Sequence, residues 1–162
     1  MSKKKSCKLK IIKWMFSFSL LAIIIFSYLL FLHYADTESF CDFAPELSCD
    51  IVNKSIYSEF PPGSGIPVSF LGIVTFMIVV VSLFSIKTNK ELKLNSFLLN
   101  KKSFSTFLFY LMLLSLLFAL YLLYTELVFI LSICILCVAA DLIIIVMLIL
   151  SYQLKVICHE KR

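Results

Sequence analysis

The sequence predicts an all-α integral membrane protein, built as a bundle of four transmembrane helices. Hydrophobic residues make up 61% of the 162 residues and charged residues only 15%, and the mean hydropathy of +1.01 is far too high for a soluble domain of this size. Four apolar segments each supply the roughly 20 residues that a helix needs to cross a bilayer. We place the spans at about residues 14–33, 67–86, 104–124 and 128–152.

The first span follows a lysine-rich N-terminus. Such a start is typical of a signal peptide, but the apolar stretch here is about twice as long as a signal-peptide core. No small-residue cleavage site follows it. We therefore expect an uncleaved anchor that stays in the bundle as its first helix.

The charged residues are distributed unequally between the two sides of the predicted bundle. All of the 15 Lys and Arg residues except Lys54 fall in the N-terminus, the loop at 87–102 or the C-terminal tail, whereas segment 34–66 holds six acidic residues. The positive-inside rule then places both termini in the cytoplasm of an inner or plasma membrane, and segment 34–66 on the periplasmic or extracytoplasmic side. Because the basic residues serve as topology signals, the net charge of +5 gives no reason to expect nucleic-acid binding.

Segment 34–66 is the one sizeable external element, and we expect it to form a cap over the bundle. Ser48 is a suitable N-cap for a short helix from Cys49 to about Phe60. Prolines and glycines in residues 61–67 end that helix and turn the chain into the second span. We expect one domain over residues 1–162, without a fused thioredoxin-like domain. The apolar residues expected to pack the cap helix on the bundle are Ile51, Val52, Ile56 and Phe60.

Four of the six cysteines form two pairs. Cys41 and Cys49 lie in the external segment, where we expect them to be exposed to an outside thiol and able to keep a disulfide. Cys134 and Cys137 lie three residues apart in the fourth span, so on a helix they share one face, with sulfurs close enough to bond once the first turn adapts. Cys134 is eight residues past Glu126, which predicts a depth of about 12 Å below the outer surface.

Each pair also has a plainer interpretation. A disulfide between Cys41 and Cys49 would be a static brace of the cap, and a transmembrane cysteine is often only a small hydrophobic residue. C-x-x-C is also a zinc spacing, but four thiolates around zinc in a lipid-embedded span would carry net negative charge without basic partners. Taken together, the pairs favour a thiol relay, because exchange needs one exposed pair, one buried pair and a flexible segment between them.

Asp141 is the one acidic residue inside a predicted span, four residues after Cys137 and on the same helix face. A charge near the bilayer centre costs about 2.5 to 3.5 kcal/mol, so Asp141 should face the bundle interior or be protonated. It is a candidate to donate a hydrogen bond or proton to a ligand beside Cys137, or to bind another helix. His33 and Glu126 sit at the predicted outer interface, where snorkelling or solvated helix ends explain them.

A family resemblance rests on the spacing of the two cysteine pairs, on Ser55, and on the stretch Gly-Ile-Pro-Val-Ser-Phe-Leu-Gly at 65–72. In these features the sequence resembles the vitamin K epoxide reductase family over about residues 14–152. The family fold is a four-helix membrane bundle around a quinone, with shuttle cysteines in the external loop. The resemblance implies that Cys41 exchanges with an external thioredoxin-fold protein, that Cys49 attacks Cys134, and that Cys137 passes electrons to the quinone.

The resemblance also implies where the quinone binds. Ser55 matches the position of the family's pocket-side serine or threonine. Val68 and Asp141 stand where animal enzymes have an asparagine and a tyrosine that bind the quinone carbonyls, and Tyr57 is a further candidate. The Gly-Ile-Pro-x-Ser stretch is similar to bacterial members, which reduce respiratory quinones.

These implications lead to a membrane thiol:quinone oxidoreductase. It would reoxidise a separate thioredoxin-fold protein of the DsbA kind and reduce ubiquinone or menaquinone, with no metal involved. The alternative within the enzyme class is a vitamin K epoxide or quinone reductase proper. The alternative from another class is a non-catalytic membrane protein whose loop disulfide only braces the cap.

Overall fold

Residues 2–35, 39–42, 47–88, 92–94, 97–99 and 101–159 are described by the structure, a computed structural model. Among them, four helices are long and apolar enough to cross a membrane, which confirms the predicted all-α membrane bundle. The acidic cap residues Asp36, Glu38 and Glu46 lie outside the described part. The four long helices are α1 (Ser2–Tyr34), α3 (Val68–Thr88), α4 (Lys101–Thr125) and α5 (Ile135–His159).

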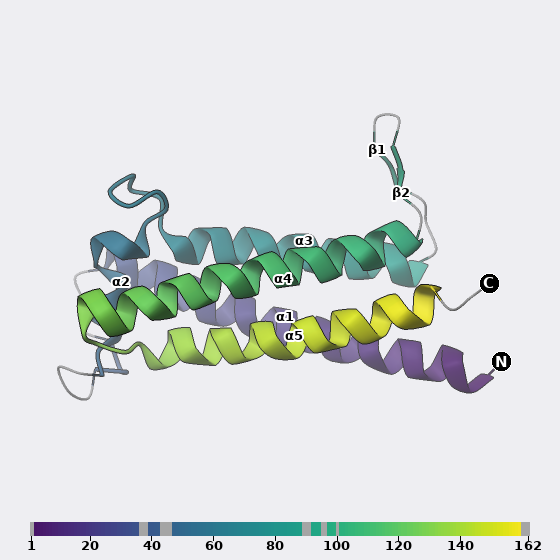
Figure 1. The fold of residues 1–162 in the computed structure, drawn as a ribbon, viewed down its shortest axis with the longest axis horizontal. Helices are drawn as coiled ribbons and strands as arrows, with labels where there is room; N and C mark the ends of the chain where they lie inside the picture. Colours follow the sequence, from purple (N-terminus) through teal and green to yellow (C-terminus); the bar gives the residue numbers. More distant parts are fainter. Residues whose placement is uncertain are drawn as a thin grey trace.

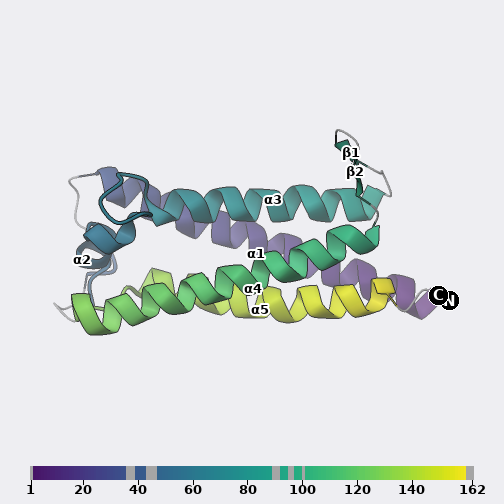
Figure 2. The ribbon, with the colours of Figure 1, turned by 45° about the horizontal axis from the view of Figure 1, so that its top comes forward.

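The long helices run side by side along the longest axis of the molecule (Figure 1). Helix α1 packs against α3 and α5, and α4 completes the bundle by packing against α5 and α3 (Figure 2). The outward faces are as apolar as the core, as lipid requires, with side chains such as Ile24 and Leu114 each 65% exposed. The buried core includes Met15, Ala22, Phe76, Val79, Leu83, Leu108, Met112 and Met147.

The two ends of the bundle differ. The N-terminus and the C-terminus lie at one end, and the cap lies at the opposite end (Figure 1). A small antiparallel hairpin of β1 (Leu92–Leu94) and β2 (Phe97–Leu99) joins α3 to α4 at the end that holds the termini. Both termini are therefore on the same side of any membrane that the bundle crosses.

The cap helix α2 (Cys49–Asn53) is much shorter than predicted. Its predicted N-cap is confirmed, because the Ser48 hydroxyl accepts a hydrogen bond from the Ile51 N–H at 3.1 Å. The predicted end near Phe60 is wrong. The hydroxyl of Ser55 donates to the Val52 carbonyl at 2.8 Å, so a side chain takes the place of the next helical N–H.

After α2 the chain forms a single 3₁₀ turn, η1 (Ile56–Ser58), and this changes which side chains face the bundle. Of the four apolar residues predicted to pack the cap on the bundle, only Val52 is buried, at 6% exposure. Ile51, Ile56 and Phe60 are each about half exposed or more, at 48%, 67% and 47%. The prediction of a continuous apolar face was wrong because it assumed one unbroken helix.

The boundary between the last two spans also differs from the prediction. Residues Glu126–Ile130 form a π-helical turn, η2, that continues α4, and α5 begins only at Ile135 rather than near residue 128. Leu131 ends η2 with a φ of 54°, a left-handed conformation that is unusual for a leucine. Residues 131–134 thus form a non-helical turn that the apolar sequence, free of Gly and Pro here, did not reveal.

Candidate active site

Cys134 is the N-cap of α5 and not part of a regular helix. Its carbonyl accepts the Val138 N–H at 3.0 Å, and its Sγ accepts the Cys137 N–H at 3.2 Å. The prediction that both cysteines share a helix face was therefore wrong in its geometry, although the capping bond still places them side by side.

Cys41 and Cys49 are joined in a disulfide. Cys49 is the first residue of α2, and both cysteines are buried, at 3% exposure for Cys41 and 0% for Cys49. The expectation that this pair is exposed to an outside thiol is wrong for the structure described. The disulfide packs against Leu29 of α1 beneath the cap, so an outside thiol reaches the disulfide only when the cap moves.

The two cysteine pairs meet in one buried cluster. Cys41, Cys49 and Cys134 belong to the same group of packed side chains, together with Leu29 and Val52. Cys134 is 0% exposed, and Cys137 is partly buried against the same cluster. This arrangement brings the cap disulfide to the free pair of α5.

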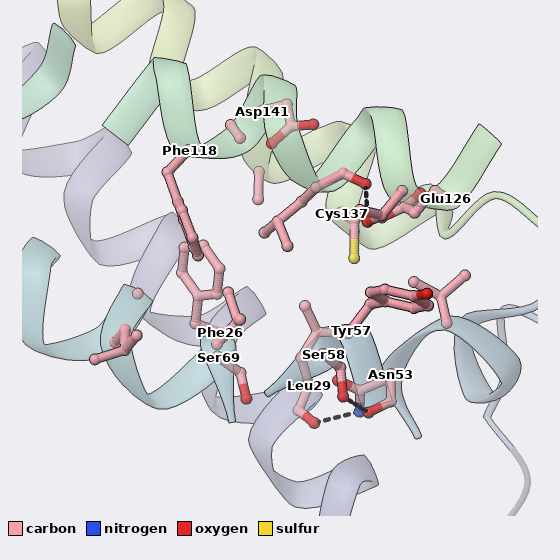
Figure 3. A pocket seen from close by; sticks show the side chains of 18 of the residues that line it. Phe26, Leu29, Asn53, Tyr57, Ser58, Ser69, Phe118, Glu126, Cys137 and Asp141 are labelled. Carbon is pink, nitrogen blue, oxygen red and sulfur yellow. Dashed lines mark hydrogen bonds between the residues drawn. The ribbon is translucent and has the colours of Figure 1, made fainter. Parts of the chain in front are cut away.

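A set of hydrogen bonds fastens the cap to α1. The Asn53 amide donates to the Leu29 carbonyl at 2.7 Å, and the carbonyl of Asn53 accepts from Nδ1 of His33 at 2.8 Å. The same carbonyl accepts from the Ser58 hydroxyl at 2.6 Å, as Figure 3 shows. His33 is therefore not a snorkelling residue. It holds the cap, and its Nε2 lies 4.0 Å from Oε1 of Glu59.

A cavity of about 130 Å³ lies between the cap and the parts of the long helices that are nearest to the cap (Figure 3). All four residues predicted to bind the quinone line it, from three parts of the structure: Ser55 and Tyr57 of the cap, Val68 of α3 and Asp141 of α5. Cys137 lines the cavity too. Much of the remaining wall is aromatic and aliphatic: Phe26, Leu29, Leu71, Phe76, Phe118 and Ile144.

Several polar residues of the cavity wall were given no site role by the sequence analysis, among them Asn53, Ser69 and Glu126. Asn53 and Ser69 lay in segments that were interpreted only as a cap helix and the start of the second span, although Ser69 belongs to the stretch that carries the family resemblance. The Ser69 hydroxyl is buried and finds no hydrogen-bond partner among the described residues. Helical serines elsewhere, such as Ser82, donate to the carbonyl four residues earlier, but Ser69 lies in the first turn of α3.

Glu126 is the third of these residues. It was predicted to be a solvated helix end, yet only 4% of it is exposed, and its Oε2 accepts the Cys134 N–H at 3.3 Å. The predicted separation of about 12 Å between these two residues is therefore wrong, because η2 and the turn at 131–134 fold Cys134 back against Glu126. Sequence alone offered one signal, an acidic residue inside a long apolar run.

On the cap surface, Asp42 lies close to the disulfide. The Ser48 hydroxyl beside it donates a hydrogen bond that, with smaller contributions from Asp50 and Ser39, holds the pKa of Asp42 below its ordinary value of 3.8. Asp50 in turn accepts the Ser39 N–H at 3.0 Å. These carboxylates fix the loop that carries Cys41.

A membrane bundle with a cap disulfide packed against a free C-x-x-C pair at a helix N-terminus belongs to the class of membrane thiol-redox proteins. Comparison with family models supports this class: the model of the vitamin K epoxide reductase family matches residues 13–152. The chain belongs to this family and is therefore a multi-pass membrane oxidoreductase. A search of curated proteins found no matching relative.

The residues around the cavity fit the quinone that proteins of this family use in their redox chemistry. The cavity volume of about 130 Å³ is close to the roughly 150 Å³ of an apolar cavity that binds benzene, so there is space for one ring of a head group. The walls are apolar and aromatic, and the unpartnered Ser69 hydroxyl offers a hydrogen bond to a carbonyl oxygen. A quinone would be held by these walls, with Cys137 at its edge.

Proposed function

We propose that this protein is a thiol:quinone oxidoreductase, which oxidises an extracytoplasmic thioredoxin-fold protein of the DsbA kind and reduces ubiquinone or menaquinone. One observation carries the proposal. Cys134 shares a buried cluster with the Cys41–Cys49 disulfide, while its neighbour Cys137 lines the cavity that fits a quinone. The C-x-x-C pair therefore lies between the cap disulfide and the electron acceptor.

The proposed electron path follows this arrangement. A reduced partner thiolate attacks Cys41, which forms a mixed disulfide and leaves Cys49 as a thiolate. The partner's second thiolate then forms the partner's own disulfide and releases the Cys41 thiolate. Cys49 attacks Cys134 of an oxidised Cys134–Cys137 pair, which forms a Cys49–Cys134 bond and releases the Cys137 thiolate. The Cys41 thiolate then attacks Cys49 of this bond, which restores the Cys41–Cys49 disulfide, releases the Cys134 thiolate and leaves the pair in α5 reduced. Cys137 lies at the cavity wall, so the two electrons leave the pair from there to the quinone.

The partner and the acceptor follow from the chemistry. Thioredoxin-fold oxidants of the DsbA kind have potentials near about −120 mV, too oxidising for glutathione to regenerate, so a respiratory quinone is the fitting sink. Because Cys41 is buried at 3% exposure, the partner must displace part of the cap before it can exchange. The partner is proposed to be a separate protein.

The membrane orientation supports the same proposal. The acidic cap lies at one end, and the lysine-rich N-terminus, the basic loop and the C-terminus lie at the other. By the positive-inside rule the cap then faces the periplasmic or extracytoplasmic side of an inner or plasma membrane, the oxidising side where disulfides persist.

The test uses the purified protein with a soluble ubiquinone analogue, a menaquinone analogue and a reduced DsbA-like protein. We expect the absorbance of the quinone to fall as disulfide forms in the partner, with one quinol per disulfide. Cys137→Ala should abolish this reaction. Cys158→Ala, at the C-terminal end of α5 and outside the proposed path, is the control and should retain the reaction. Quinone reduction that persists in Cys137→Ala contradicts the proposal.

A further inference from the structure

The carboxyl group of Glu126 lies against both members of the C-x-x-C pair. Its Oε2 accepts the backbone N–H of Cys134 at 3.3 Å, and Glu126 and Cys137 line the same cavity. Figure 3 shows Glu126 and Cys137 next to each other on the same wall of the cavity. One buried side chain therefore binds the backbone of one cysteine and lies beside the other.

The surroundings of Glu126 offer it no cation. Among the described residues that line the cavity there is no Lys, Arg or His side chain. The titratable groups near it are the Cys137 thiol and the Asp141 carboxyl of α5, with the Tyr57 phenol of the cap stacked on Phe129 of η2. A carboxylate placed in an apolar wall without a counter-charge is costly, so a purely structural role is a poor explanation for it.

The backbone around Glu126 is also arranged to keep it in place. Residues Glu126–Ile130 leave the α-helical pattern for a π-helical turn, and Leu131 adopts the left-handed conformation that turns the chain back. π-helical turns are rare and occur frequently at functional sites. This turn brings the Cys134 N–H back to the carboxyl eight residues earlier.

We propose that Glu126 is the proton carrier of the C-x-x-C pair, which takes the proton of the Cys137 thiol and delivers it to the reduced quinone. The inference rests on the thiol:quinone exchange proposed above and names a catalytic residue for it. Glu126 lies beside the reacting thiol on the cavity wall, and the hydrogen bond from the Cys134 N–H keeps the carboxyl in place through the cycle.

The step balances. Oxidation of the pair breaks the S–H bonds of Cys134 and Cys137 and forms one S–S bond, and two electrons pass to the quinone. The Cys137 proton moves to the Glu126 carboxylate and from there to one quinone oxygen. The Cys134 proton goes to the other oxygen, which completes the quinol. Glu126 ends the cycle as it began.

Two variants separate proton transfer from positioning. Glu126→Gln keeps an oxygen that accepts the Cys134 N–H but cannot carry a proton, whereas Glu126→Leu loses both properties. We expect Glu126→Gln to unfold at the wild-type temperature and to form the Cys134–Cys137 disulfide with a chemical oxidant, yet to reduce quinone about 100-fold more slowly. Glu126→Leu should reduce quinone slowly too, and should also lose the order of the turn at residues 131–134, because no side-chain oxygen accepts the Cys134 N–H. Glu59→Gln, an acid of the cap that binds the Gly65 N–H, is the matched control.

A second readout needs no quinone. Infrared difference spectra of the reduced protein before and after oxidation by diamide should show a new carboxylic-acid C=O band in the wild type and in Glu59→Gln. The band should be missing in Glu126→Gln. A band that persists in Glu126→Gln, or its absence from the wild type, overturns the proton-carrier role, as does an unchanged quinone rate. If the wild type reduces no quinone, the proposed function fails, and the infrared band still decides the role of Glu126.

Discussion

The backbone N–H of Cys137 donates a hydrogen bond to Sγ of Cys134 across 3.2 Å. This bond makes Cys134 the cap of α5 and aims the positive end of the helix at its sulfur. Cys137 meanwhile faces the cavity. The two cysteines therefore differ in environment: Cys134 caps α5 and packs with the cap disulfide, whereas Cys137 lines the cavity.

Substitution of Cys134 should separate capping from redox chemistry. Serine keeps an oxygen that caps α5, whereas alanine leaves the Cys137 N–H without its partner. In the reduced protein we expect Cys134→Ser to be as stable as the wild type and Cys134→Ala to lose about 1 kcal/mol in free energy of unfolding. Neither variant should oxidise a partner. Equal stability of the two variants, measured by denaturant unfolding in detergent, would show that the thiol does not cap the helix.

Loss of the Asn53 side chain should loosen the cap. Asn53 is 6% exposed, and its amide donates to the Leu29 carbonyl, which Asn53→Ala would leave buried without that partner. We expect external dithiothreitol to reduce the Cys41–Cys49 disulfide several-fold faster in this variant, as followed by thiol alkylation and mass spectrometry. Ile51→Ala, a truncation of a half-exposed neighbour on the same helix, should keep the wild-type rate. Similar rates in all three proteins would mean that Asn53 does not hold the cap.

Acidification should open the cap through Asp42. Because the Ser48 hydroxyl holds its folded-state pKa below 3.8, the carboxylate stabilises the cap at any pH above that value, and this stabilisation is lost as the pH falls through the lowered pKa. We expect a water-soluble phosphine to reduce the Cys41–Cys49 disulfide faster as the pH drops below 3.8. In Asp42→Asn the reduction should already be fast at neutral pH, without this rise. If the reduction rate of the wild type depended on pH in the same way as that of Asp42→Asn, Asp42 would not be the residue that stabilises the cap.

Gly72 sets the width of the cavity. A Cβ at this position would lie 2.7 Å from the Phe26 ring, so Gly72→Ala must push that ring aside, and both residues line the cavity. We expect the variant to raise the KM for quinone several-fold while exchange between the cap and a reduced partner keeps its rate. Val74 of α3 is 41% exposed, and Val74→Ala should change neither the KM for quinone nor the rate of exchange with the partner. A normal KM in Gly72→Ala would place the quinone elsewhere.

The sequence predicted the four-helix bundle because hydropathy over about 20 residues depends little on tertiary contacts. It did not predict where α4 ends. That boundary depends on the left-handed conformation of Leu131 and on a thiol that caps α5, and the helix propensities of the local residues predict neither feature. The length of α2 was overestimated for a related reason, since the Ser55 hydroxyl competes with the backbone for a carbonyl.

In the candidate site, too, local sequence predicted some features, whereas features that depend on tertiary contacts were missed. Spacing found both cysteine pairs, and the family resemblance found four residues that the structure places around one cavity. Glu126 was missed because its meeting with Cys134 depends on the turn at 131–134. The burial of the cap disulfide was missed because it depends on how α2 packs on α1.

The central claim is that the cap pair and the pair in α5 exchange disulfides directly. The most direct measurement uses the double variant Cys41→Ala with Cys137→Ala, which leaves Cys49 and Cys134 without their usual partners. After mild oxidation in the membrane, we predict that peptide mapping by mass spectrometry finds a Cys49–Cys134 disulfide within single chains. Recovery of both cysteines as free thiols, under conditions in which the wild type forms both of its disulfides, would contradict the account.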